Sequence, residues 1–455
     1  MRRIRGCALV LFVLSAACSS KVAHRSAPQQ RSPNDPTPAG SDQGTDPQDP
    51  TEQGDDGGVV SLDAGGGDHD GGGGGGATCV AAARGWRAMA SEATVTKGLN
   101  FQMGAPPVWD GREVLVMGSV QPTSCPSGTC PNQIETAAYD PALDRWRLLP
   151  NPAITSPYQF ASMFTGKSWV LIGTSGPLVA YSFDVATETW TSTKAPLSPG
   201  WGVAVTYMAS THEAFVFGGT DGFGLNNAAA AYSDVTHAWR MLPNAPLSPR
   251  AGSFATYAGG KVLVAFGFDD PNGDGCCSAI PGTALFDPIT NAWTMLDDPP
   301  VKPRVANDPK MANALGDGTL ASIGFGYSRG FEDPLPPMEN DGAMWDVVKS
   351  GWTKIPNVGF VDPTRMGFAT FVANGKLFVW GGTGEPPPAT VNTYYDDGKS
   401  FDPGTGTWST MAMGGPSPRQ SAGAVFTGCD AVVYGGSSRT IGKWLPYNDG
   451  MLYRP

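Results

Sequence analysis

The chain has 455 residues and is rich in glycine (61) and proline (41), while charged residues make up only 16% of it. This composition favours many short strands joined by Gly/Pro turns, a disordered portion, or both, and length alone does not set the number of domains in an all-β protein. The net charge is −11, and neither residues 19–78 nor residues 79–455 contain a cluster of basic residues. Both facts argue against nucleic acid as a partner.

Residues 1–17 have the form of a secretory signal. Met1–Arg5 contains three arginines, residues 7–14 are apolar, and small residues follow. The apolar run is too short to span a bilayer. We therefore expect the chain to be exported and this segment to be removed.

The sequence LSAAC, which ends at Cys18, resembles a bacterial lipobox, although Ser15 stands where the usual pattern has Leu. The resemblance implies that Cys18 is diacylated and becomes the new N-terminus. Ser19, where Asp would signal retention in the inner membrane, favours the outer membrane. The alternative is plain secretion after cleavage near Ala17.

Residues 18–78 are predicted to be the lipidated cysteine followed by a disordered tether. The stretch is rich in Pro, Gly, Ser and Asp and has no aromatic residue, so it cannot form a core that offsets the entropy of ordering. A flexible chain of this length spans about 40 Å. It would hold the following domain away from a membrane.

Residues 79–455 contain an internal repeat marked by tryptophan. The repeat tryptophans are Trp86, Trp146, Trp190, Trp239, Trp293, Trp352 and Trp408. Six of them have an aromatic residue seven positions earlier, and five have Asp six positions earlier, as in YDPALDRW and FDPITNAW. In the third unit, YSDVTHAW, the Asp is shifted to Asp234. Each unit reads as four short strands, with the Trp on the fourth.

These units resemble the kelch repeat, which has Gly-Gly after the second strand, an aromatic-Asp pair on the third and Trp on the fourth. Gly218-Gly219, Gly381-Gly382 and Gly435-Gly436 match, and the other units degrade the pair. The resemblance covers nearly all of 79–455 and implies an all-β, seven-bladed kelch-type β-propeller. In that fold the Trp and Tyr side chains pack between blades.

The seventh unit ends without a Trp, while Trp86 near the start has no strands before it. Joining Tyr453–Pro455 to Ala82–Trp86 restores the spacing from aromatic residue to Trp. We therefore expect the N-terminal segment to supply the outer strand of the last blade, which removes the open edge of the ring.

Six cysteines remain after Cys7 leaves with the signal and Cys18 is acylated, an even number that suggests disulfides in an exported protein. Cys125 and Cys130 share one loop, and Cys276 and Cys277 are adjacent. Cys79 and Cys429 would then meet beside the closing strand and staple the ring. Zinc is the competing interpretation, and the absence of a nearby His opposes it.

Four arginines open first strands after Pro/Ser/Thr-rich linkers: Arg250, Arg304, Arg365 and Arg419. Because first strands line the central channel of a propeller, these side chains could ring its mouth and attract an anionic ligand. The alternative, which we favour, is structural pairing. Asp270, Asn272 and Asp274 match the first half of a calcium loop, but Pro281 stands where the bidentate Glu belongs; the alternative is a polar turn.

The chain is expected to be a monomeric envelope lipoprotein that binds a protein or a glycan, touching the membrane only through its lipid. The alternative is a carbohydrate-active kelch enzyme similar to a sialic acid mutarotase, for which we identify no catalytic residue. Copper chemistry like that of galactose oxidase needs two His and two Tyr. His212 and His237 are the only histidines after residue 78, and both fall in ordinary turn positions.

Overall fold

The computed structural model describes residues 79, 82–91, 105–120, 133–154, 160–173, 178–197, 201–221, 224–269, 278–306, 312–326, 339–384, 393–440 and 443–455. The predicted signal (1–17) and most of the predicted tether (18–78) with its Cys18 therefore lie outside the described residues. In the described part every regular element is a β-strand, and no helix there has the length and hydrophobicity to cross a membrane.

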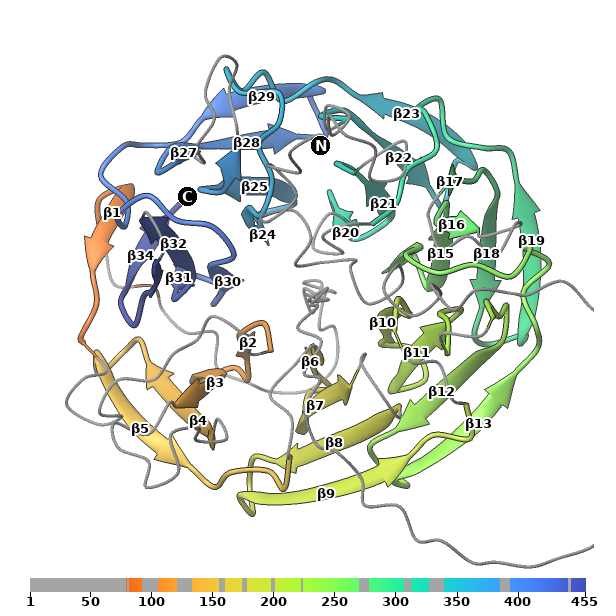
Figure 1. Cartoon of the computed structure of the whole chain (residues 1–455), viewed down its shortest axis with the longest axis horizontal. Helices are drawn as coiled ribbons and strands as arrows, with labels where there is room; N and C mark the ends of the chain where they lie inside the picture. Colours follow the sequence, from red (N-terminus) through yellow and green to blue (C-terminus); the bar gives the residue numbers. More distant parts are fainter. Residues whose placement is uncertain are drawn as a thin grey trace, which may run out of the picture.

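Seven four-stranded antiparallel sheets surround a central axis, as Figure 1 shows, so the predicted seven-bladed propeller is confirmed. Blades 1 to 3 consist, from the inside outward, of β2 (Val108–Trp109), β3 (Val114–Val120), β4 (Gln133–Asp140) and β5 (Arg145–Leu149); β6 (Phe160–Phe164), β7 (Ser168–Gly173), β8 (Val179–Asp184) and β9 (Thr189–Lys194); and β10 (Ala204–Met208), β11 (Glu213–Phe217), β12 (Ala229–Ser233) and β13 (Ala238–Leu242).

Blades 4 to 6 follow the same order. They consist of β14 (Phe254–Ala258), β15 (Lys261–Ala265), β18 (Thr283–Asp287) and β19 (Ala292–Leu296); β20 (Ala312–Leu315), β21 (Leu320–Ile323), β22 (Gly342–Asp346) and β23 (Gly351–Ile355); and β24 (Ala369–Ala373), β25 (Lys376–Trp380), β28 (Gly398–Asp402) and β29 (Thr407–Thr410).

Blade 7 is built from both ends of the described chain. It contains β30 (Gly423–Phe426), β31 (Ala431–Tyr434), β34 (Gly450–Arg454) and, outermost, β1 (Gly85–Ala88). In the β1–β34 register, Trp86 lies opposite Tyr453. The predicted closure by the N-terminal segment is confirmed.

Three connections between second and third strands are extended by two-stranded hairpins. These are β16 (Phe268–Asp269) with β17 (Ser278–Ala279), β26 (Thr383–Gly384) with β27 (Thr393–Tyr394), and β32 (Ser437–Thr440) with β33 (Lys443–Pro446). They belong to blades 4, 6 and 7 and were not predicted from the sequence.

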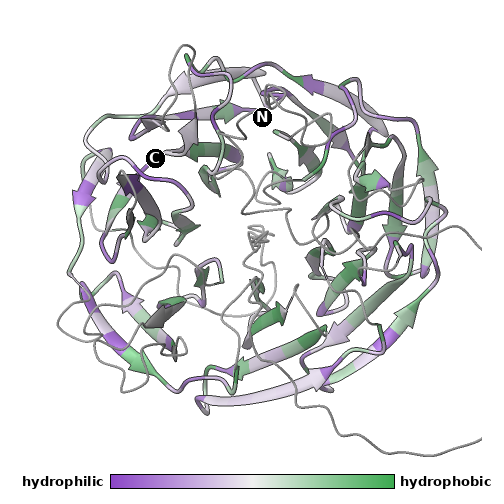
Figure 2. Cartoon of the chain, viewed as in Figure 1, coloured by the Kyte–Doolittle hydropathy of each residue, from purple (hydrophilic) through white to green (hydrophobic). Residues whose placement is uncertain are grey.

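The hydrophobic core of the propeller lies among the inner strands of the blades. All six residues of β7 are buried, whereas β9 at the outside of the same blade is largely exposed. Figure 2 shows green, apolar strands toward the middle of the ring and mixed colours along the outer strands. Apolar faces of neighbouring blades therefore pack on each other, which the hydrophobic effect favours.

The aromatic-to-Trp spacing of the repeat becomes a cross-strand pair in all seven blades. The pairs are Tyr139–Trp146, Phe183–Trp190, Tyr232–Trp239, Phe286–Trp293, Trp345–Trp352, Phe401–Trp408 and Tyr453–Trp86, with ring centroids 4.9–5.3 Å apart. Contact of this kind between aromatic rings adds to the area that each ring buries.

Each of these indoles also ties its blade to the preceding one. The Nε1 of Trp190 donates to the carbonyl of Pro150, just beyond β5 (2.6 Å), and the six other repeat tryptophans bond carbonyls at equivalent places. At the closure, Trp86 donates to Ala412 O (2.8 Å) and Trp146 to Ala90 O (2.9 Å). The repeat Trp thus both fills the core and joins blades in one direction around the ring.

The Asp of the repeat caps the turn between the third and fourth strands. Asp140 Oδ1 accepts backbone N–H groups from Ala142 and Leu143, and the other repeat aspartates act alike. In blade 3 the cap is Ser233 Oγ, with Thr236 N at 3.3 Å. The shifted Asp234 instead accepts a bond from Thr165 of blade 2 (2.6 Å), so it joins two blades.

Candidate ligand-binding face

The up-and-down blades give the ring two faces. We call the face with the second-to-third-strand connections and the linkers between blades the loop face. The opposite face, with the first-to-second and third-to-fourth turns, is the turn face. The three extra hairpins lie on the loop face, and Cys429 lies in the turn between β30 and β31 on the turn face.

The four arginines predicted from the sequence lie on the loop face but are buried, with 1–2% of each residue exposed. Their guanidinium groups donate mainly to backbone carbonyls of their own blade. Arg365 Nε reaches Gly381 O (2.8 Å), Arg250 NH1 reaches Pro281 O (2.9 Å) and Arg304 NH1 reaches Asp341 O (2.7 Å). Arg419 NH1 bonds Gly435 O (3.0 Å) in the same way.

The backbone of these arginines explains the Gly-Gly of the repeat. The N–H of Gly219 in blade 3 donates to Arg250 O at the entry of blade 4 (2.9 Å), and Gly382 N bonds Arg419 O (2.7 Å). A Cβ on Gly218 would lie 2.7 Å from that carbonyl of Arg250, so only glycine allows the approach. Arg250, Arg304 and Arg419 therefore bind the preceding blade with their backbone carbonyls and their own blade with their side chains.

Two of the arginines stack on aromatic rings, and we call each of these arginines with the rings around it an aromatic box. The Arg365 guanidinium sits 4.0 Å from the Phe360 ring centroid and 4.2 Å from that of Tyr395, and Arg419 sits 3.9 Å from Tyr447. Burial lowers the pKa of Arg365, and the Asp397 carboxylate at 2.7 Å offsets part of that effect. The side chain remains charged, because arginine starts from a pKa above 12.

Tyr395 is further held by a buried carboxylate. Its hydroxyl donates to Asp362 Oδ2 (2.8 Å), while Asp362 Oδ1 accepts from the backbone and hydroxyl of Thr364. Burial, and then the bond to Asp362, raise the pKa of Tyr395 to about 12. The phenol therefore stays protonated at neutral pH and serves as a fixed donor.

The groups that reach solvent over these boxes are acidic. In the pairs Arg365–Asp397 and Arg419–Asp449, the arginine side chains are 2% and 0% exposed, but the aspartates are 38% and 60% exposed. The burial of the four arginines agrees with the structural pairing that we favour from the sequence, and not with an open ring of arginines for an anionic ligand. The guanidinium groups are covered because they satisfy backbone carbonyls that would otherwise be buried without a donor.

Two large apolar side chains are exposed on the same region. Val361 lies in the linker between blades 5 and 6 and is fully exposed, and Met413 lies in the linker between blades 6 and 7. They flank the Arg365 and Arg419 boxes along the chain. The loop face of blades 5–7 therefore offers apolar contacts, carboxylates and rigid support, and we call it the candidate site.

On the turn face, a disulfide staples the closing strand. Cys79 and Cys429 are 350 residues apart in sequence and are joined by a disulfide, with their Cα atoms 5.5 Å apart. This confirms the predicted staple. A cross-link over so long a loop restricts the unfolded chain strongly in the loop-entropy account.

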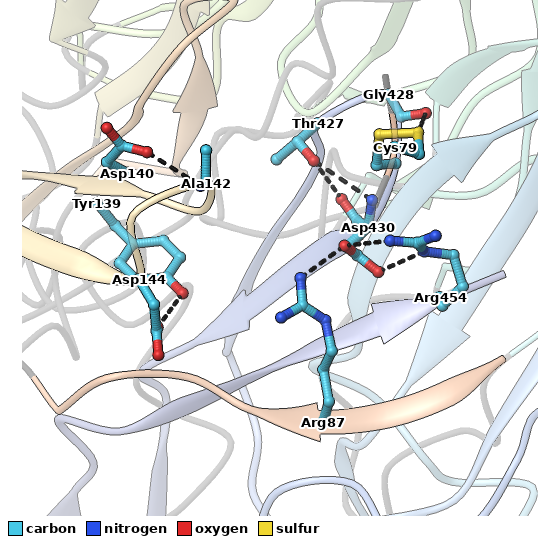
Figure 3. A network of polar contacts seen from close by, with 11 residues as sticks. Cys79, Arg87, Tyr139, Asp140, Ala142, Asp144, Thr427, Gly428, Asp430 and Arg454 are labelled. Atoms are coloured by element: carbon cyan, nitrogen blue, oxygen red, sulfur yellow. Dashed lines mark hydrogen bonds and ion pairs between the residues drawn. A yellow bond between two sulfur atoms is a disulfide. The ribbon is translucent and has the colours of Figure 1, made fainter. Parts of the chain in front are cut away.

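An ion triad beside this disulfide holds the same closure (Figure 3). Arg454 of β34 donates to both oxygens of Asp430, at 2.7 and 2.9 Å, and Arg87 of β1 donates to Oδ2 at 2.8 Å. Burial raises the pKa of Asp430, but the bonds from Arg454 and Arg87 outweigh it and leave the pKa below the usual range. This triad was not predicted from the sequence.

No protein-family model matches the chain. Over 304 residues it is 25% identical to Kelch domain-containing protein 3 of Rattus norvegicus and of Mus musculus, an alignment that covers 62% of this chain and 74% of each relative. The weak identity coincides with a seven-bladed ring in which the repeat Trp pairs with an aromatic ring and bonds a carbonyl of the preceding blade in every blade. The chain is a kelch-repeat β-propeller. A kelch-repeat propeller suggests a protein-binding scaffold.

Several predicted sites of this kelch-repeat propeller lie outside the described residues. They are Cys125, Cys130, Cys276 and Cys277, and the candidate calcium ligands Asp270, Asn272 and Asp274, which all stay predictions. Within the described ranges, no group of three or more His, Cys, Asp or Glu is placed to hold a metal ion. Both histidines lie in turns: His237 Nδ1 is 3.3 Å from Tyr232 OH, and His212 Nδ1 is 3.2 Å from Tyr207 OH.

Proposed function

We propose that this propeller belongs to a bacterial envelope lipoprotein, held in the outer membrane through Cys18, whose loop face binds an envelope protein. The observation that carries the proposal is the Cys79–Cys429 disulfide, because structural disulfides persist in oxidising compartments outside the cytoplasm. It agrees with the secretory signal and lipobox-like sequence at residues 1–18.

The candidate site favours a protein over a glycan as the ligand. Sugars are held well by exposed aromatic faces, but Phe360, Tyr395 and Tyr447 each have a face covered by a buried guanidinium. Val361, Met413 and the carboxylates of Asp397 and Asp449 suit a protein surface with apolar and basic side chains.

A capture experiment with paired variants tests this proposal. The full chain, cross-linked in envelope extracts, is expected to recover a defined protein, and Val361→Asp with Met413→Asp should weaken recovery at least tenfold. Met241→Asp with Met295→Asp on the outer rim is the matched control, because these methionines are also exposed. Equal loss in both variants, or recovery of glycan alone on a glycan array, would refute the loop face as a protein site.

A further inference from the structure

Exposed apolar side chains gather at the tips of the turn face. Of the nine large apolar residues exposed in the described part of the chain, four lie in third-to-fourth-strand turns: Leu143, Val235, Ile289 and Val348, exposed by 57, 67, 70 and 74%. They belong to blades 1, 3, 4 and 5 and stand at nearly the same turn position. A turn needs no apolar residue there, since blade 6 has Gly404 at the position of Ile289.

The N-terminal stretch of the chain joins the propeller on this same face. Cys79 is bonded to Cys429 in the first turn of blade 7, and β1 then runs away from the turn face. The disulfide therefore fixes where residues 1–78 leave the ring. The point at which the chain that leads to Cys18 joins the propeller is therefore on the turn face and not on the loop face.

Charges beside the apolar tips are largely paired. The Asp287 carboxylate next to Ile289 binds Lys261 (3.3 Å), and Asp346 next to Val348 binds Lys349 (2.9 Å). Beside Val235, the carboxylate of Asp234 is buried and accepts the Thr165 hydroxyl. The tips of blades 3, 4 and 5 can therefore approach an apolar medium without carrying an isolated charge into it. In blade 1, the Asp144 carboxylate next to Leu143 accepts the N–H of Ala90 and the hydroxyl of Tyr139.

We propose that the turn face rests on the lipid surface to which the chain is anchored, with these four tips in the interfacial region of the bilayer. The predicted tether then limits how far the domain can move from the membrane and does not hold it away. The tips belong to separate blades, so they form no contiguous patch of the kind that protein partners usually need. A flat bilayer can meet all of them at once. The loop face then points away from the membrane, toward its ligand. This inference rests on the anchor proposed above.

Fluorescence on vesicles tests the orientation independently of the anchor. A polyhistidine tag inserted between Cys18 and Cys79 holds the full chain on phosphatidylcholine vesicles that contain a nickel-chelating lipid, whether or not Cys18 is acylated. An environment-sensitive fluorescent amino acid replaces Ile289 on the turn face or, as the matched control, Val361 on the loop face. We expect a blue shift and quenching by brominated phosphatidylcholine at position 289, and neither at 361.

Two triple variants show whether the tips cause this orientation. With the probe at position 143, Val235→Asn, Ile289→Asn and Val348→Asn together should abolish the quenching. Leu148→Asn, Met241→Asn and Met295→Asn on the rim, which remove apolar residues that are 48–50% exposed, should leave it unchanged. Circular dichroism checks that both variants fold.

If the probe at position 289 remains exposed to water on vesicles that carry no other protein, the inference is overturned. The tips would then contact a protein partner. Quenching at 361 in place of 289 overturns it as well. The mass of the N-terminal peptide from the chain made in a bacterial host reports acylation of Cys18 separately. Failure of the anchor is thereby distinguished from failure of the orientation.

Discussion

Deleting residues 79–90 is expected to destroy the cooperative unfolding of the propeller. The deletion removes β1, the Cys79–Cys429 disulfide, the Trp86 bond to Ala412 and the Ala90 carbonyl that accepts Trp146. Losing the Trp side chain and the cross-link alone should cost at least roughly 5 kcal/mol. Differential scanning calorimetry should show a melting temperature lower by more than about 10 °C, or no transition.

A circular permutant provides the control for this deletion. In this variant, residues 79–91 are attached after Pro455 through a flexible linker. The same strand can then pair with β34 although it now follows β34 in the chain. We expect the permutant to recover most of the lost melting temperature. A deleted chain that melts like the intact one would contradict closure by this strand.

Asp430→Asn is expected to lower the free energy of unfolding by about 3 kcal/mol at pH 7, because it leaves Arg87 and Arg454 side by side without a counter-charge. The Asp430 side chain is 4% exposed and that of Arg454 15%, so water screens little of this repulsion. Arg87 is 39% exposed and contributes less. Urea denaturation measures the loss.

Glu213→Gln in blade 3 is the matched variant for the triad. Glu213 is the first residue of the second strand of its blade, and Asp430 directly precedes the second strand of blade 7. Glu213, however, binds a single arginine, Arg240, at 2.6 Å. Arg240 is 41% exposed, so the loss should be less than half of that in Asp430→Asn. Equal losses would show that the closure has no special dependence on its ion triad.

The Asp430 triad also sets a pH dependence. The folded pKa of Asp430 lies below the value of about 4 for an unfolded aspartate, so the triad stabilises the fold above that pH. The stabilisation is lost as the pH falls through the folded pKa. The stability gap between the natural chain and Asp430→Asn should therefore close as the pH falls below about 4. A gap that stays constant as the pH falls would exclude the carboxylate as its cause.

The fold could be predicted from sequence because its signal repeats. Seven tryptophans, each paired with an aromatic residue, mark seven blades, and the missing seventh partner at Tyr453 points to Trp86. The staple followed from the same topology, since Cys79 and Cys429 both border the closing strand. A motif that recurs in every blade is hard to explain by any other architecture.

The role of single side chains was less predictable because burial depends on loops with no repeat. Pro-Arg at a blade entry does not reveal whether the guanidinium faces the channel or folds back on carbonyls such as Gly381 O. The hairpin of β32 and β33 has no counterpart in blades 1 to 3, so no repeated sequence pattern predicts it.

The triad at the closure does have a signal in the sequence. An arginine follows the repeat Trp in blades 1, 3 and 7, at Arg147, Arg240 and Arg87. Each binds an acidic residue at or just before the second strand of its blade: Glu113, Glu213 and Asp430. Reading the acid and the arginine as a pair would have placed Arg87 against Asp430 across 343 residues.

Peptide mapping of the intact protein under non-reducing conditions is the most direct test of ring closure by the N-terminal strand. We expect one linked pair of peptides that contain Cys79 and Cys429, which separates on reduction. Cys79 found free, or bonded to Cys125, Cys130, Cys276 or Cys277, would contradict it.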